Sequence, residues 1–165
     1  MDIVIEEMKP GDWPQVSAIY LAGIRTGSAT FQSDVPGWEE WDRSHCACCR
    51  LVARSGDTVL GWAALSPVSS RCVYAGVAEV SIYVSDAYRG KGIGKTLLNK
   101  LVLESEQHGF WTLQAGIIRE NVASRELHRT CGFRELGIRE RLGRMPNGAW
   151  HDVVWMERRS KTVGL

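Results

Sequence analysis

The most regular alternation of apolar and polar residues in the chain runs from Ala78 to Val84. Successive side chains of a strand point to opposite faces. The pattern therefore predicts a strand with an apolar face and a polar face that carries Glu79. A glycine-rich segment, residues 89–94, comes next. It leads into leucines at helical spacing, which predict an amphipathic helix from Lys95 that Gly109 is placed to end.

The same two periodicities divide the rest of the chain into strands and helices. Asp12 is a candidate N-cap for the first helix, and the turn at residues 55–57 predicts a hairpin. Further strands are predicted at residues 3–8, 51–53, 58–65 and 111–117, from Phe133 onward and at 150–156, and further helices at 12–20, 36–41 and 121–131. This order predicts one α/β (α+β) domain over residues 1–157, with a C-terminal tail over 158–165. Its central sheet would be mixed and mostly antiparallel, with flanking helices.

Composition narrows the functional classes. The chain of 165 residues has a net charge of +1 and 24% charged residues, so nothing indicates a nucleic-acid-binding or membrane-binding surface. No apolar run approaches membrane-spanning length and no cationic-then-apolar leader opens the chain, so we expect a cytoplasmic protein. Three of the five cysteines lie between Cys46 and Cys49. We expect reduced thiols and no metal site there, because the cysteines are crowded and no second Cys/His pair is near them in sequence.

A strand, a glycine-rich loop and a helix in this order are a common phosphate-binding motif. The first amides of a helix have no partner within the helix, and the helix dipole adds partial positive charge to them. Glycines let the loop backbone approach an anion, and Arg89, Lys91 and Lys95 add full charges. The spacing does not fit a Walker A loop, which needs a glycine where Arg89 stands, or a dinucleotide-binding G-x-G-x-x-G loop.

The loop resembles the pyrophosphate loop of the GCN5-related N-acetyltransferases (GNAT). Its pattern, Arg/Gln-x-x-Gly-x-Gly/Ala, is met by Arg89, Gly92 and Gly94. Residues 121–133 are similar to the second signature of that superfamily, and the resemblance extends over residues 3–156. It implies the GNAT fold, in which a central strand splays away from its neighbour at a bulge.

Three further features are similar to one branch of the superfamily, which contains the phosphinothricin and the methionine sulfoximine or sulfone acetyltransferases. They are the C-terminal segment 148–153, the pair Thr30-Phe31 and Glu79. The resemblance also implies a homodimer, with the tryptophan-rich C-terminal hairpin as a candidate interface.

The resemblance implies that acetyl-CoA is the acyl donor. Its pyrophosphate would lie on the glycine-rich loop, and its pantetheine arm would extend along the end of the central strand as an additional strand. A backbone N–H of that strand end would polarise the thioester carbonyl. The residues expected to bind acetyl-CoA are Ile82, Tyr83, Val84, Arg89, Gly90, Lys91, Gly92, Ile93, Gly94, Lys95, Asn121 and Ser124.

Two side chains are candidates for proton transfer. Glu79 carries the only carboxylate of the central strand and is the candidate general base that takes a proton from the amine. His128 stands where many relatives carry a tyrosine thought to donate a proton, and it is the candidate general acid. Each has a structural alternative: Glu79 could face solvent or pair with an arginine, and His128 could be a packing or capping residue.

The acceptor amine is expected to lie near the polar face of the central strand and the segment ahead of it. The candidate contacts are Phe31, Arg71, Ala75, Gly76, Val77 and Glu79. Relatives that act on methionine sulfoximine often carry an aromatic or basic residue in that segment, where this chain has small residues. Either Arg71 supplies the positive charge that a basic residue of this segment would provide, or the pocket is larger and takes a different amine.

The resemblance predicts an N-acetyltransferase that moves the acetyl group of acetyl-CoA to the α-amino group of a small amino-acid-like molecule. Phosphinothricin, methionine sulfoximine and methionine sulfone are the expected types. Direct attack within a ternary complex is the expected mechanism. Two alternatives remain open: acetylation of a peptide, a protein or another small amine, and a non-catalytic acyl-CoA sensor, against which Glu79 argues.

Overall fold

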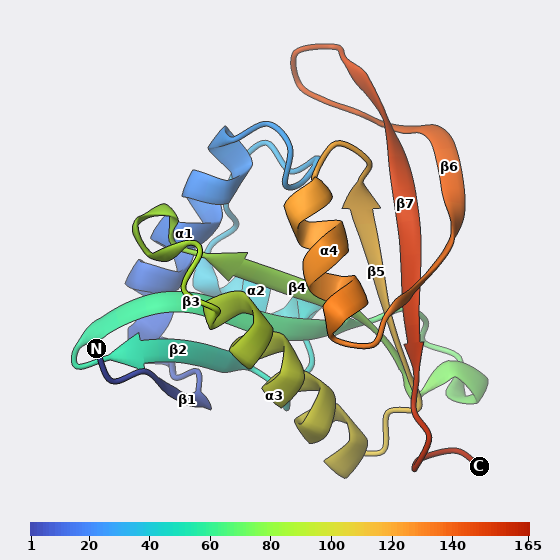
Figure 1. Ribbon diagram of the computed structural model, residues 1–165, viewed down its shortest axis with the longest axis horizontal. Helices are drawn as coiled ribbons and strands as arrows, with labels where there is room; N and C mark the ends of the chain where they lie inside the picture. The colour runs from blue at the N-terminus through green and yellow to red at the C-terminus, as the bar shows by residue number, and fades with distance from the viewer.

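A seven-stranded sheet forms the centre of the computed structural model, which describes residues 1–165. The order of its strands is β1-β2-β3-β4-β5-β7-β6 (Figure 1). The strands are β1 (Val4–Glu7), β2 (Leu51–Ser55), β3 (Thr58–Pro67), β4 (Val77–Val84), β5 (Thr112–Ile118), β6 (Arg134–Arg144) and β7 (Trp150–Arg159). The helices are α1 (Trp13–Arg25), α2 (Trp38–Ser44), α3 (Ile93–Gln107) and α4 (Val122–Thr130), with 3-10 turns η1 (Pro10–Asp12), η2 (Cys72–Tyr74) and η3 (Asp86–Tyr88).

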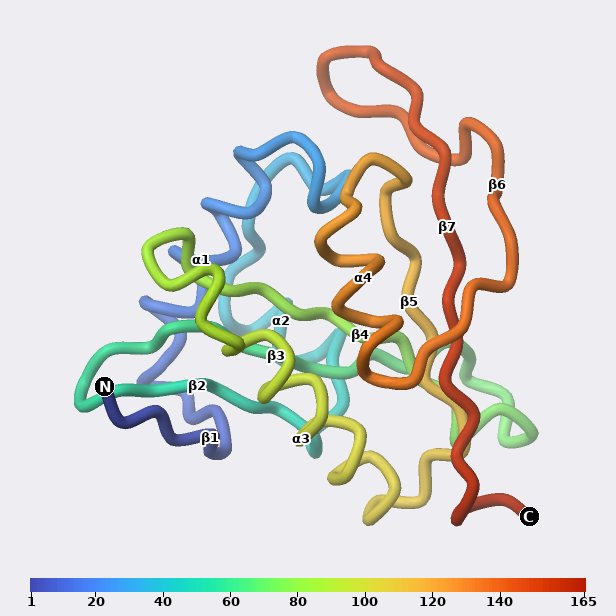
Figure 2. The backbone as a smooth tube through the Cα atoms, in the orientation of Figure 1, coloured from blue at the N-terminus to red at the C-terminus, as the bar shows by residue number.

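The predicted order of elements and the mixed, mostly antiparallel sheet are confirmed. Only β4 and β5 run parallel, and their pairing covers no more than residues 77–79 of β4. Beyond that point the two strands diverge (Figures 1 and 2). The expected bulge is not the cause, because β4 stays paired with β3 from Ala78 to Val84 without a register shift. β5 stays paired with β7 from Thr112 to Ile118, so each strand follows its outer neighbour and the sheet opens between them.

Helices cover both faces of the sheet, and each face has its own apolar core. Helices α3 and α4 lie on one face, where Leu97, Leu98 and Leu101 of α3 are fully buried. Burial of each leucine contributes about 1.5–3 kcal/mol, which fixes α3 against β3 and β4. Helices α1 and α2 cover the other face, where Trp41 packs against Trp62 of β3. None of the helices combines the length and the apolar character needed to span a membrane.

Asp12 stands at the N-cap position of α1 but does not act as the cap that the sequence predicts, since its side chain accepts no hydrogen bond from the helix. Its buried carboxylate instead accepts hydrogen bonds from the backbone N–H of Lys9 at 2.9 Å and from Nη2 of Arg54 at 2.6 Å. A buried carboxylate needs partners, and Arg54 provides one from β2. The pair joins the start of α1 to the sheet.

The last residues of the chain are bound to the domain. Strand β7 continues to Arg159, whose guanidinium donates to the carbonyl oxygens of Val163 at 2.8 Å and Gly164 at 2.6 Å. Ser160 is buried, and its hydroxyl donates to the carboxylate of Glu106 at 2.5 Å. The segment 158–165, which the sequence sets apart as a tail, therefore packs beside the C-terminal end of α3.

Candidate active site

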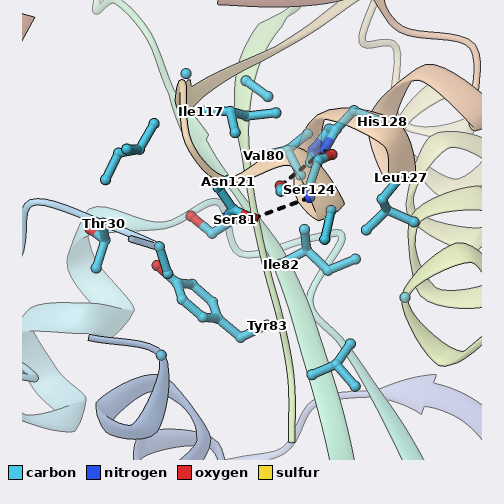
Figure 3. Close-up of a pocket in the computed structure, with 18 of the residues that line it drawn as sticks. Thr30, Val80, Ser81, Ile82, Tyr83, Ile117, Asn121, Ser124, Leu127 and His128 are labelled. Atoms are coloured by element: carbon cyan, nitrogen blue, oxygen red, sulfur yellow. Dashed lines mark hydrogen bonds between the residues drawn. The ribbon is translucent and has the colours of Figure 1, made fainter. Parts of the chain in front are cut away.

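A cleft of about 530 Å³ opens where β4 and β5 diverge. Residues 79–84 of β4 line one side, and residues 115–118 of β5 line the other. The glycine-rich loop, α4, the segment 29–31 and the β6–β7 hairpin complete the lining. Figure 3 shows side chains from β4, β5 and α4 around the same space. The cleft is thus a direct consequence of the splayed sheet.

The β5-facing backbone of β4 has no strand partner along the cleft. Pairing with β5 ends at Glu79, while pairing with β3 continues to Val84. This leaves backbone N–H and C=O groups exposed on one edge over a span of about 17 Å, at roughly 3.3 Å per residue. An unpaired strand edge binds extended ligands that carry amide groups. The geometry fits the pantetheine arm of acetyl-CoA.

The glycine-rich loop presents backbone amides and leaves space in front of them. Gly90 and Gly92 both have φ of +77°, a conformation that favours glycine. A Cβ atom at either position would meet no protein atom within 4 Å. Gly92 is the N-cap residue of α3 and offers no side-chain cap, so the first amides of the helix, from Ile93 onward, are free. The loop therefore fits a pyrophosphate group.

The three basic residues of the loop are placed differently from one another. Arg89 lines the cleft, and its guanidinium pairs with Asp86 at 2.9 Å. Lys91 and Lys95 are exposed and do not line the cleft, and the ammonium group of Lys91 lies 5.7 Å from the centre of the Tyr88 ring. The other ten residues expected to bind acetyl-CoA all line it. Of the three basic side chains of the loop, only that of Arg89 lines the cleft, and the other two lie on the surrounding surface.

Glu79 is half-buried in the cleft and has no ionic partner. It shares the α1-facing side of β4 with Ser81 and Tyr83, because Ala78 and Val80 belong to the core on the α3 side. Burial raises the pKa of its carboxyl group, and no nearby charge opposes this effect. The arginine pair that the sequence leaves open is not formed. A carboxylate with a raised pKa is a better proton acceptor than an ordinary one.

Tyr83 lies farther along the same face of β4. Its ring stacks on Trp62, with centroids 5.1 Å apart, and its hydroxyl points toward Thr30 (Figure 3). Burial, and secondarily Tyr20, raise the pKa of Tyr83, so the phenol stays protonated. Gly23 of α1 faces the ring, and a Cβ there would lie 2.7 Å from it. Packing against Trp62 and Gly23 therefore fixes the position of the Tyr83 ring.

Asn121, Ser124 and His128 are joined by hydrogen bonds along α4 (Figure 3). Oδ1 of Asn121 accepts a hydrogen bond from the backbone N–H of Ser124 at 3.2 Å and caps the helix. Nδ1 of His128 donates to the carbonyl oxygen of Ser124 at 2.7 Å, while Nε2 is buried without a partner. Burial lowers the pKa of His128. The imidazole is thus held neutral with a lone pair on Nε2, which opposes the predicted role as a proton donor.

Residues 29–31 and the β6–β7 hairpin, which are distant in sequence, also line the cleft. Phe31 packs on Gly143 of β6, where a side chain would collide with its ring, and lies 6.4 Å from the ring of His151. Leu142 and two residues of β7 also line the cleft. Of these, Trp155 has a buried indole N–H without a partner. The C-terminal signature at 148–153 marked the hairpin and includes Val153, but it does not include Leu142 or Trp155.

Four predicted substrate contacts lie outside the cleft: Arg71, Ala75, Gly76 and Val77. The guanidinium of Arg71 lies 5.6 Å from the centre of the Tyr74 ring. Gly76 has a packing role, because a Cβ there would collide with the ring of Trp111. Val77 lies opposite Thr112 in the closed part of the sheet. The segment ahead of β4 therefore leads to the joined end of the two strands, away from the opening.

Comparison with known proteins gives one family and one branch. The model described as the acetyltransferase (GNAT) family matches residues 13–133. A phosphinothricin N-acetyltransferase of Streptomyces coelicolor is 36% identical over 163 residues, covering 94% of this chain and 92% of that protein. An L-methionine sulfoximine/L-methionine sulfone acetyltransferase of Pseudomonas aeruginosa is 30% identical over 163 residues, covering 95% and 94%.

A solved structure supports the same comparison. The phosphinothricin acetyltransferase of Sinorhizobium meliloti, determined in complex with AcCoA, superposes with a TM-score of 0.88 at 29% identity. The match covers 99% of this chain and 91% of that protein. The two proteins therefore share their fold over nearly the whole of both chains.

Proposed function

We propose a substrate class and a mechanism for this protein, which belongs to the acetyltransferase (GNAT) family and is an N-acetyltransferase that uses acetyl-CoA. The acceptor is the α-amino group of a small amino-acid-like molecule of the phosphinothricin, methionine sulfoximine or methionine sulfone type. Two observations support this class. The relatives compared above carry these names at 30–36% identity, and apolar side chains of the β6–β7 hairpin line the same cleft as Glu79.

The chain holds the acyl donor through backbone groups. The amides of Gly92, Ile93 and Gly94 receive the pyrophosphate at the start of α3, where helix and loop both favour an anion. The free edge of β4 receives the amide groups of the pantetheine arm. A backbone N–H of the same edge stabilises the oxyanion that forms on the thioester carbonyl.

Glu79 acts as the general base that deprotonates the acceptor amine. An α-amine is mostly protonated at neutral pH and has no lone pair for attack. Glu79 takes one proton from the ammonium group, directly or through one water molecule. The amine nitrogen then bonds to the carbonyl carbon, and the carbon–sulfur bond breaks with its electron pair leaving on the sulfur of CoA. The second proton of the nitrogen passes to that thiolate or to water, which leaves the neutral amide. Both reactants are bound together, so no acyl-enzyme forms.

Phe31 and the β6–β7 hairpin enclose the acceptor. Phe31, Leu142, Val153 and Trp155 present an apolar surface across the cleft from the polar face of β4. Such a surface suits the short side chain of an amino-acid-like acceptor and limits the access of water.

One observation carries the proposal. The backbone pairing of β4 with β5 ends at Glu79, so a carboxylate with a raised pKa stands at the start of an unpaired strand edge that leads to the phosphate loop. A module that only senses acyl-CoA needs the loop and the edge but has no use for a half-buried, unpaired carboxylate at that point.

A thiol-release assay with a panel of amines tests the proposal. The panel holds phosphinothricin, methionine sulfoximine, methionine sulfone, a polyamine, an aminoglycoside and a peptide with a free N-terminus, with mass spectrometry of each product. We expect turnover with the first three compounds and acetylation at their α-nitrogen. Turnover confined to the last three would overturn the substrate class but keep the mechanism. Tight binding of acetyl-CoA without turnover of any compound would favour the sensor alternative.

A further inference from the structure

The fold brings three metal-ligating side chains together far from the cleft. Cys48 and Cys49 precede β2, and His108 follows α3. The two thiol sulfur atoms and a ring nitrogen of His108 all lie within 4.8 Å of one another. Sγ of Cys49 is 3.8 Å from Nδ1 of His108, although the two residues are 59 positions apart in sequence. The sequence predicts no metal site here, because only the folded chain brings the histidine to the cysteines.

The loop that carries the two cysteines is held in one conformation. The guanidinium of Arg50 donates to the carbonyl oxygens of Cys46 at 2.6 Å and His45 at 3.2 Å, and it also pairs with Asp42. Cys49 has φ of +60°, one of only two residues other than glycine with a positive φ. A cysteine in the left-handed region is uncommon and persists where its surroundings enforce it. Here that conformation holds the Cys49 thiol in the cluster.

The position of His108 is fixed by the end of helix α3. His108 is the C-cap residue of α3, and its backbone N–H donates to the carbonyl oxygen of Glu104. Its ring is exposed, so the cluster has an opening to solvent on this side, whereas Cys49 is buried and Cys48 is half-buried. A partly open group of soft ligands can receive a cation from solvent.

We propose that Cys48, Cys49 and His108 bind a thiophilic divalent cation, with Zn²⁺ as the expected ion and a water molecule as the fourth ligand. Zinc–sulfur bonds of about 2.3 Å and zinc–nitrogen bonds of about 2.0–2.1 Å in a tetrahedron place the ligand atoms roughly 3.5–3.8 Å apart. The separation of 3.8 Å between Cys49 and His108 already meets this requirement. Sulfur and imidazole ligands favour Zn²⁺ over Mg²⁺ or Ca²⁺, which prefer oxygen.

Binding changes the protonation of the cluster. Both thiols release their protons to become thiolates. Nδ1 of His108, which now lies 2.9 Å from the carbonyl oxygen of Glu104, loses that contact to coordinate the ion, and the ring carries its proton on Nε2. The cation then joins the loop before β2 to the end of α3. This end of α3 is opposite the end that carries the phosphate loop, so the site stabilises the fold and takes no part in acetyl transfer.

Titration of the reduced, chelator-treated protein with Co²⁺ tests the proposal. Cobalt reports on the ligands, because thiolate bonding gives a charge-transfer band and tetrahedral geometry gives intense visible bands. We expect one ion per chain with both signals, displaced by Zn²⁺, and a higher Tm when Zn²⁺ is present. Absence of the thiolate band in the unmodified protein would overturn the proposal.

Variants at Cys48 and His108 identify the site. Cys48→Ser and His108→Asn should each weaken Zn²⁺ binding at least tenfold in competition with a chromophoric chelator and abolish the rise in Tm. The matched control is Cys72→Ser, which removes an exposed thiol that lies outside the cluster and should bind like the unmodified protein. Unchanged affinity in Cys48→Ser and His108→Asn, or an equal loss in Cys72→Ser, would overturn the proposal.

Discussion

Glu79 of β4 and Gln114 of β5 form the last backbone pair that joins these two strands. Beyond this pair β4 continues for five residues beside β3 alone, and the cleft occupies the opening. The candidate base therefore lies at the vertex of the splayed sheet. From this vertex the unpaired edge of β4 leads toward the glycine-rich loop, so one geometric feature places the candidate base beside the candidate binding edge for the acyl donor.

Replacement of Glu79 by Gln should lower kcat at neutral pH by about 10²–10⁴-fold, the usual contribution of a general base. The affinity for acetyl-CoA should change little, because the amide keeps the shape of the side chain and the loop is intact. Steady-state kinetics and calorimetry with acetyl-CoA separate the two effects. Glu140→Gln on the exposed face of β6 is the control for loss of a carboxylate. Full activity in Glu79→Gln would remove the residue from the mechanism.

The same variant should be more stable than the unmodified protein at neutral pH. Burial raises the pKa of Glu79 in the folded state, so the folded chain binds this proton more tightly than the unfolded chain. Stability from this group is fully present below the ordinary glutamate pKa and is lost as pH rises through the raised value. Thermal unfolding of both proteins over a pH series checks this. The Tm difference should shrink at acid pH, and a destabilised variant at neutral pH would contradict the prediction.

Much of the fold could be predicted because its signals are local. The alternation from Ala78 to Val84, the glycines of the loop and the leucines of α3 each depend on neighbours in sequence, and the structure has these elements as expected. The order of the strands within the sheet depends on pairing between distant segments, which such patterns do not contain. Asp12 shows the limit of local reasoning, since its carboxylate is bound by Arg54, 42 residues away.

The parts of the site that were missed depend on contacts between distant segments. Nothing near Arg71 in sequence reveals that the segment before β4 runs to the joined end of the strands. Nothing near Trp155 reveals that β7 crosses to the cleft. His108 likewise approaches Cys49 only because α3 packs across the sheet. Sequence patterns predicted the strand edge and the glycine-rich loop that line the cleft, whereas the side chains that reach the cleft from the C-terminal hairpin needed the structure.

Replacement of Gly92 by Val should weaken acetyl-CoA binding by at least tenfold. The new side chain would enter the open space before the α3 amides, and its backbone would be strained at φ of +77°. Gly56→Val is the matched control, because Gly56 also has a positive φ and open surroundings but lies in the β2–β3 turn. Calorimetry should find weaker binding only in Gly92→Val. Equal affinity in both variants would contradict the assignment of the loop.

His128→Asn should lower kcat less than tenfold. The neutral imidazole donates to the carbonyl oxygen of Ser124 through Nδ1, and the asparagine amide preserves a donor at a similar position. The lowered pKa of His128, caused by burial, leaves no proton on Nε2 to give at neutral pH. The pH profile of kcat distinguishes the roles. A loss of about 100-fold, together with disappearance of the alkaline limb, would restore His128 as the general acid.

We expect a homodimer in which the C-terminal hairpin forms the interface, so replacement of Ile138 by Lys should give a monomer. Strand β6 is the edge of the sheet, and Leu136 and Ile138 on it are each 49% exposed, which is typical of an edge that another chain covers. A lysine there places a charge in an apolar interface. Light scattering after size exclusion measures the mass. Val73→Lys is the control, because Val73 is 63% exposed on η2. An unmodified protein that runs as a monomer, or an Ile138→Lys variant that remains dimeric, would rule out this interface.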